Sequence, residues 1–233
     1  MKEFIDAFKK SSYYQELFKS SEILAIFLLG STCTDIVDDN SDYDITILTL
    51  DGYYIDSSKY EYLMYKDKKV HWYYYPIKDV FGLVHKAQEL KVLCPIQLRN
   101  LCDDFIIYEN PKYKNSLQTL YKIKTEISKL GICLLYDMRK DYIDAIINNG
   151  YVNKKHYSKW LYHLCLASYY IINEEPNKDF LRILKRIRWE PVPDEYKQLA
   201  VKRLQVYKNY IEQNPLNIAE ELDKLYKQLK IPY

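Results

Sequence analysis

ILAIFLLGS at residues 23–31 and SDYDITILT at residues 41–49 are the two stretches that decide the fold of this chain. The first is an unbroken apolar run of strand length that ends in Gly30 and Ser31. The second opens with two carboxylates and continues as an apolar, β-branched run. A glycine and a serine directly after a buried strand can bring backbone N–H groups and a hydroxyl against a phosphate. The sequence therefore predicts two core strands joined by a phosphate-binding loop.

Asp42 and Asp44 are the candidate metal ligands, because residues i and i+2 of a strand point to the same face. Tyr43, which lies between them, points to the other face. Paired carboxylates supply the hard oxygen ligands that Mg²⁺ prefers. We expect the two strands at residues 23–29 and 44–50, so the carboxylates lie at the mouth of the second strand. The alternative interpretation is that these acids form a solvated strand end and that the Gly-Ser pair is an ordinary turn.

Together the two stretches resemble the nucleotidyltransferase superfamily that includes DNA polymerase β. The signature of that superfamily is a strand ending in Gly-Ser, followed by a strand that carries Asp-x-Asp. The resemblance implies that Asp42 and Asp44 hold Mg²⁺ or Mn²⁺ and take part in catalysis. It also implies that Gly30 and Ser31 cradle the phosphates of a nucleoside triphosphate.

The superfamily takes a third carboxylate from a later strand, and the matching place here is KVHW at residues 69–72. His71 occupies that place. An imidazole brings no negative charge to a metal site, but it can ligate one metal ion or accept a proton near neutral pH. Two interpretations stay open, a catalytic His71 and a packed core histidine. The nearby acids that might replace it are Asp56, Asp67 and Asp79.

Apolar spacing and turn residues predict the remaining elements of the first half. We expect an opening helix at residues 4–18, a hairpin formed by residues 60–65 and 70–75, and a helix at residues 79–90. Further helices are expected within residues 111–139 and at 178–189, 193–213 and 216–230.

The predicted fold class is α/β (α+β). A nucleotidyltransferase catalytic domain with a mixed β-sheet flanked by helices is expected at residues 1–110, and an all-helical domain at residues 111–233.

KKHYSKWLYHLCL at residues 154–166 is the most informative stretch of the second half. It resembles the YcgL-type nucleotidyltransferases of bacteria and phages, in which a Lys and a Tyr-His pair recur on this helix. Lys155, Lys159 and His163 are spaced i, i+4 and i+8 and form a column on one helix face. We expect Lys159 and His163 to bind the triphosphate from the helical side. The alternative is a solvated helix face.

The sequence favours a metal-dependent nucleotidyltransferase that moves an NMP from an NTP to an acceptor with release of pyrophosphate. The acceptor stays open between an RNA end, a protein and a small molecule. The alternative, favoured by His71, is a nucleotide-binding or antitoxin-like protein with impaired catalysis. A third interpretation is a nucleic-acid-binding module, which would use the basic ridge of Lys178, Arg182, Lys185 and Arg186.

Composition agrees with an intracellular enzyme. The chain has 233 residues, 48% of them hydrophobic and 28% charged, with a formal net charge of +2. No apolar run is long enough to span a bilayer, and the first residues do not begin a signal peptide, so we expect a cytoplasmic protein without a membrane partner. The cysteines number five and include no Cys-x-x-Cys pair, which favours buried thiols over zinc ligands or a disulfide framework.

Overall fold

The computed structural model describes residues 1–29, 31–33, 39, 41–51, 63–78, 106–149, 158–186, 193–215 and 217–231. These residues form a mixed α/β structure with two compact units, each of which is described by itself. Unit 1 comprises Met1–Gly131 and Ile218–Tyr233, and unit 2 comprises Ile132–Asn217. The division into a catalytic domain at residues 1–110 and a helical domain at residues 111–233 stays a prediction.

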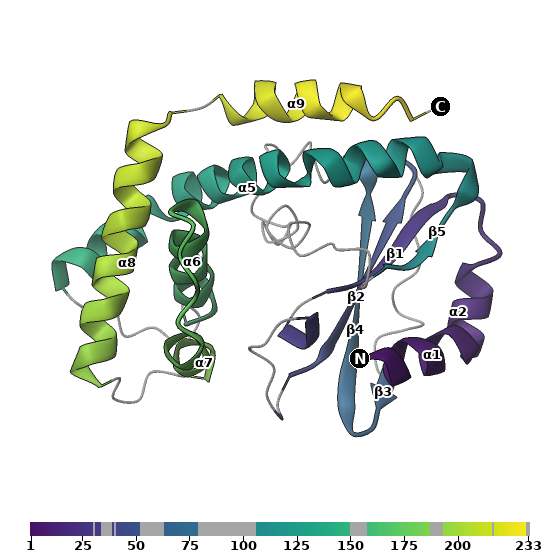
Figure 1. The fold of residues 1–233 in the computed structure, drawn as a ribbon, viewed down its shortest axis with the longest axis horizontal. Coiled ribbons are helices and arrows are strands. Elements are labelled where there is room, and N and C mark those ends of the chain that lie inside the picture. Colours follow the sequence, from purple (N-terminus) through teal and green to yellow (C-terminus); the bar gives the residue numbers. More distant parts are fainter. Residues whose placement is uncertain are drawn as a thin grey trace. The chain divides into compact units, whose positions relative to one another are not determined.

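A five-stranded mixed sheet is the centre of unit 1 in the part of the chain that is described (Figure 1). Its strand order is β3-β4-β2-β1-β5. β1 is antiparallel to both β2 and β5, whereas β2 runs parallel to β4. The predicted mixed sheet and its two predicted core strands are therefore confirmed. The strands are β1 Ile23–Leu29, β2 Tyr43–Thr49, β3 Leu63–Tyr65, β4 Lys68–Pro76 and β5 Ile106–Glu109.

The predicted hairpin is formed by β3 and β4. Lys66 and Asp67 at its tip both have positive φ angles, of 47° and 63°. A two-residue turn with positive φ at both positions matches the twist of antiparallel strands. β5 was not predicted, because four residues are too few to display a period.

The opening helix is broken in two, contrary to the single helix predicted for residues 4–18. α1 spans Lys2–Lys10 and α2 spans Ser12–Leu17. Between them Ser11 is extended, with φ −71° and ψ 152°, and its hydroxyl accepts a hydrogen bond from the Tyr14 backbone N–H at 3.2 Å. A serine in this conformation is a preferred N-cap, so it starts a new helix where the apolar spacing alone would continue the first.

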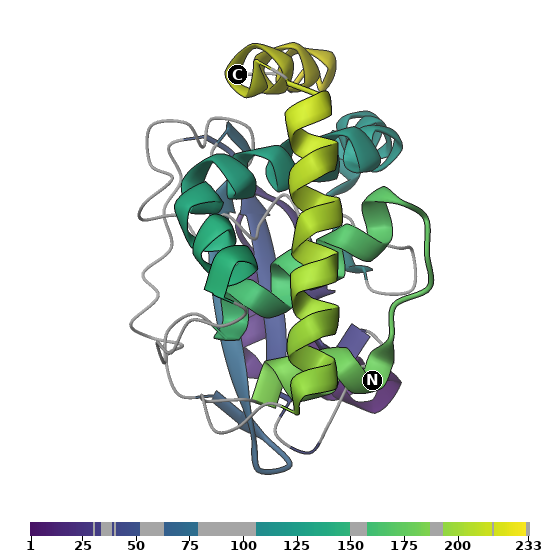
Figure 2. The ribbon, with the colours of Figure 1, turned by 90° about the vertical axis from the view of Figure 1, so that its left-hand side faces the viewer.

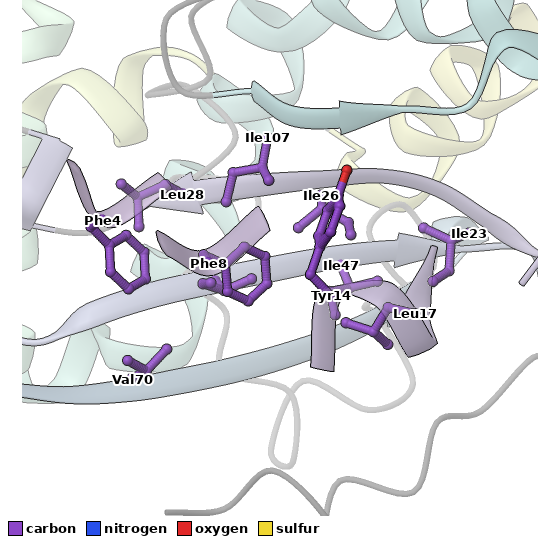
Figure 3. Packing of buried hydrophobic residues seen from close by; sticks show 11 residues of the cluster. Phe4, Phe8, Tyr14, Leu17, Ile23, Ile26, Leu28, Ile47, Val70 and Ile107 are labelled. Carbon is purple, nitrogen blue, oxygen red and sulfur yellow. The ribbon is translucent and has the colours of Figure 1, made fainter. Parts of the chain in front are cut away.

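These two helices cover one face of the sheet. The ring of Phe4 stacks on Tyr43 with centroids 3.9 Å apart, and Phe8 packs against Trp72 at 5.1 Å. Figure 3 shows Phe4 and Phe8 among apolar side chains of the strands, including Leu28, Ile107 and Val70. The buried cluster comprises Phe4, Phe8, Tyr14, Leu17, Ile23, Ile26, Leu28, Ile45, Ile47, Val70 and Ile107.

The opposite face of the sheet packs against the first part of the long helix α5. Following the short helix η4 at Pro111–Tyr113, α5 spans Lys114–Asn149 and contributes residues to both units. The ring of Tyr121 lies edge-on to Phe27 of β1, at 6.3 Å. At the C-terminal end of unit 1, α9 spans Ile218–Gln228. The sheet therefore carries a helix on each face, as an α/β sheet must to bury both sides.

Unit 2 is helical in its described residues (Figure 2). Arg203 holds two of its helices together, because its guanidinium lies 3.8 Å from the centre of the Tyr169 ring and pairs with Glu174 at 2.5 Å. Besides the second part of α5, the helices are α6 Ser158–Ile171, α7 Lys178–Arg186 and α8 Asp194–Gln213. The helices predicted from residue 111 onward are confirmed in the residues described.

Some predictions lie outside the described residues. They include the helix at 79–90 and the state of Cys94 and Cys102. Cys133 and Cys165 are buried free thiols, as predicted, and burial raises the pKa of Cys133 to about 11. Cys33 is half-buried. Within the described residues, no helix combines the length and the apolar character that crossing a membrane requires.

Candidate active site

The two predicted metal ligands lie at the start of β2. Asp44 is the second residue of the strand and Asp42 directly precedes it. Both are partly exposed, and 40% of the Asp42 side chain is accessible to solvent. Tyr43 packs on Phe4, on the sheet face that α1 and α2 cover. The alternation of side chains predicted for this segment is therefore observed at the tyrosine.

His71 lies on β4, beside these carboxylates. In the parallel register of β2 and β4, the Cα partner of Asp44 is His71. The Nε2 atom of His71 is 3.2 Å from Oδ2 of Asp42, and 44% of the histidine side chain is exposed. The histidine is therefore not a packed core residue.

Tyr73 belongs to the same cluster and was missed by sequence reasoning. It follows His71 by two residues, on the same face of β4, and its hydroxyl is hydrogen-bonded to the Asp44 carboxylate. Burial raises the pKa of the Tyr73 phenol, and the negative charge of Asp44 raises it further. The phenol therefore stays protonated and donates to Asp44. Strand alternation was the sequence signal that could have found it.

Thr46 is a second residue that sequence reasoning missed. It follows Asp44 by two residues on β2, its Cα partner on β4 is Tyr73, and its side chain is fully buried. Among the described residues, its hydroxyl oxygen has no hydrogen-bond partner. A buried hydroxyl without a partner is uncommon in native structures, so this position calls for an explanation.

The expected phosphate loop begins at the same end of the sheet. Leu29, the last residue of β1, is the Cα partner of Asp44, and the short helix η1 at Ser31–Cys33 follows. Side chains of η1 fold back onto β1: Thr32 Oγ1 donates to the Leu29 carbonyl at 3.3 Å and Cys33 Sγ to the Leu28 carbonyl at 3.1 Å. Gly30 and the side chain of Ser31 lie outside what the structure describes.

Lys159 and His163 lie on α6, in unit 2. His163 is half-buried, with its ring 4.9 Å from that of Tyr162 and nearly perpendicular to it. Tyr162 and Leu166 of the same helix are buried. The side chain of Lys159 is not among those described. Triphosphate binding by this helix stays a prediction.

The acids considered as replacements for His71 do not join the cluster in the part of the chain described. Asp67 sits in the β3–β4 turn, four residues before His71, which in a strand corresponds to roughly 13 Å. Asp56 and Asp79 lie outside the described residues. The described residues contain no group of three or more His, Cys, Asp or Glu side chains arranged to hold a metal ion.

The basic ridge of α7 is partly neutralised. Arg182 pairs with Asp179 one turn earlier, at 3.2 Å. Phe180, Leu181 and Leu184 are buried and anchor the helix in unit 2. Nucleic-acid binding by the ridge stays a prediction.

No protein-family model and no curated protein matches the chain. Among solved structures, it is similar to the crystal structure of a nucleotidyltransferase-like protein from Exiguobacterium sibiricum 255-15, with 16% sequence identity. That comparison covers 94% of this chain and 79% of the other, with a TM-score of 0.30. The comparisons do not support the assignment to the YcgL-type branch.

Proposed function

We propose that this chain is a metal-dependent nucleotidyltransferase that moves an NMP from an NTP to a hydroxyl acceptor and releases pyrophosphate. The observation that carries the proposal is the convergence of Asp42, Asp44 and His71 at one end of the sheet. β2 supplies the two carboxylates, and the parallel neighbour β4 supplies the imidazole. Leu29, the last residue of β1, lies opposite Asp44, so a phosphate-binding loop after β1 would begin beside the carboxylates.

The donor set at the mouth of β2 fits a magnesium ion. Mg²⁺ is commonly held by one or two protein carboxylates, while substrate phosphates and water complete its octahedron. Asp42 and Asp44 are two such carboxylates, and both are accessible to solvent. They would hold Mg²⁺ or Mn²⁺, which when bound neutralises charge that develops on the triphosphate. A site that depends on substrate for its other ligands needs no third acidic residue.

The contact between His71 and Asp42 assigns different tasks to the two ring nitrogens. An ionised carboxylate only accepts hydrogen bonds, so Nε2 must carry the proton that it shares with Asp42. The lone pair of a neutral His71 then lies on Nδ1. We therefore assign Nδ1 as the atom that accepts a proton from the attacking hydroxyl, with Asp42 stabilising the imidazolium that forms.

The proposed reaction balances without any further reactant. The acceptor oxygen forms a bond to the α-phosphorus, and the bond from that phosphorus to the bridging oxygen breaks. Pyrophosphate leaves with the electron pair, and the hydroxyl proton passes to Nδ1 of His71. The backbone at Gly30 and Ser31 would bind the phosphates of the leaving group, and Lys159 and His163 would add positive charge from the helical unit.

Label transfer tests this function. The protein is incubated with each α-³²P-labelled NTP, with Mg²⁺ or Mn²⁺, and with total RNA or cell lysate as the source of acceptor. We expect transfer with at least one NTP and stoichiometric pyrophosphate. Asp42→Asn and Asp44→Asn should each abolish it. Asp67→Asn is the matched control, because it removes an exposed carboxylate at a positive φ that asparagine also tolerates.

The label-transfer experiment, together with NTP binding, also distinguishes nucleotidyl transfer from the rival function. Metal-dependent NTP binding that requires Asp42 and Asp44, without pyrophosphate release from any NTP, would favour a nucleotide-binding or antitoxin-like protein. This rival is favoured by His71, which stands where the superfamily has its third carboxylate. Absence of both binding and transfer would overturn the two functions together.

A further inference from the structure

Each carboxylate at the mouth of β2 has its own partner on β4. His71 reaches Asp42, and Tyr73 reaches Asp44. In the register of the two strands, however, His71 stands beside Asp44 and Tyr73 beside Thr46. Each of these two β4 side chains therefore contacts the β2-side residue two positions before its Cα partner, toward the start of β2. Both direct a hydrogen-bond donor at a carboxylate.

The two partners differ in kind. His71 is an exposed imidazole, whereas Tyr73 is a partly buried, neutral phenol. A phenol hydroxyl donates one hydrogen bond and carries no charge that would repel a cation. An ionised carboxylate has about four lone-pair sites, so accepting one such bond does not prevent it from binding a metal.

We propose that Tyr73 is a positioning residue that holds the Asp44 carboxylate in the orientation required to bind a divalent cation. The proposal rests on the proposed function, because it takes Asp44 to be a metal ligand. Groups that hydrogen-bond to metal-binding carboxylates fix their orientation, and their loss typically weakens metal affinity or activity about 10–100-fold. Tyr73 stands in that relation to Asp44.

The test is the affinity for Mn²⁺, measured by the electron paramagnetic resonance signal of the free ion. It is measured for the full chain with Mn²⁺ alone and with Mn²⁺ plus inorganic triphosphate, which supplies phosphate ligands without any choice of base. Tyr73→Phe removes only the hydroxyl, and we expect it to weaken Mn²⁺ binding about 10-fold or more. Tyr75→Phe is the matched control, since its ring stacks parallel to that of Tyr73 on the same face, with centroids 6.4 Å apart.

A second measurement separates positioning from folding. The thermal midpoint of Tyr73→Phe should match that of Tyr75→Phe while the Mn²⁺ affinities of the two variants differ. Equal Mn²⁺ affinity of Tyr73→Phe and the unmodified protein would overturn the proposal. Should Tyr73→Phe fold poorly, 3-fluorotyrosine at position 73 keeps the hydroxyl, and saturating Mg²⁺ must move its ¹⁹F resonance. An unmoved resonance would overturn the proposal equally.

Asp44→Asn distinguishes failure of this inference from failure of the proposed function. If Asp44→Asn weakens Mn²⁺ binding and Tyr73→Phe does not, Asp44 is a ligand that needs no positioning, and only the role of Tyr73 is wrong. If Asp44→Asn leaves Mn²⁺ binding unchanged, the metal site itself is wrong, and the proposed function fails together with the role of Tyr73.

Discussion

Thr46→Val should stabilise unit 1, because it removes a buried hydroxyl that has no hydrogen-bond partner among the described residues. The side chain of Thr46 is 0% exposed, so its hydroxyl has lost water without gaining a partner in the part of the chain that is described. Leaving such a group unsatisfied costs about 1–3 kcal/mol. Valine keeps the branched shape that suits a strand and replaces the hydroxyl by a methyl group. Allowing for imperfect repacking, we expect a gain of about 1–2 kcal/mol in the free energy of unfolding.

Urea unfolding of unit 1 measures this gain. The chain has three tryptophans, and with Trp160 and Trp189 replaced by phenylalanine, the fluorescence of Trp72 in β4 reports on the sheet. With a slope of about 2 kcal/mol per molar urea, the midpoint should rise by about 0.5–1 M.

Thr46→Ser is the matched control for Thr46→Val. It keeps the hydroxyl and loses one buried methyl group, and should lower the stability by about 1 kcal/mol. A fall in the midpoint for Thr46→Val as large as that for Thr46→Ser would refute the reasoning, since it would mean that the hydroxyl is satisfied.

Three further predictions concern the site. Asp42→Ala combined with Asp44→Ala should abolish metal-dependent NTP binding and leave the fold intact, because both residues lie at the start of a strand. Calorimetry measures the NTP affinity and circular dichroism the fold. Unchanged affinity in a folded variant would contradict the prediction. His71→Asp should create or raise NMP transfer if a third carboxylate is what the site lacks, whereas His71→Ala should lose most of the transfer if the imidazole is the base; rates that change with neither substitution would exclude both roles. Lys159→Ala should weaken binding of a triphosphate more than binding of the nucleoside, since it removes one charge. Equal losses of the two affinities in competition binding would indicate a folding defect. No loss of either affinity would indicate that Lys159 is a solvated surface residue.

The strands that carry the site could be predicted because their signals are local. β1 is an unbroken apolar run, which can be recognised as a strand from its own residues alone. The alternation around Tyr43 places Asp42 and Asp44 on one face of β2. The β3–β4 hairpin was equally predictable from two β-prone runs around a short polar turn. The break at Ser11 was missed because a capping serine competes with a helical period that looks continuous.

The contacts within the site required the tertiary structure. Parallel pairing of β2 with β4 joins strands that are separated in the chain, and no local pattern specifies their register. That register places His71 beside Asp44 and brings Tyr73 and Thr46 into the cluster. Burial depends on everything that packs around a side chain. It raises the pKa of Tyr73 and leaves the Thr46 hydroxyl without a partner among the residues described. The sequence by itself thus determined which side chains bring the chemistry, and the sheet decided which of them meet, because spacing along one strand is local and pairing between strands is not.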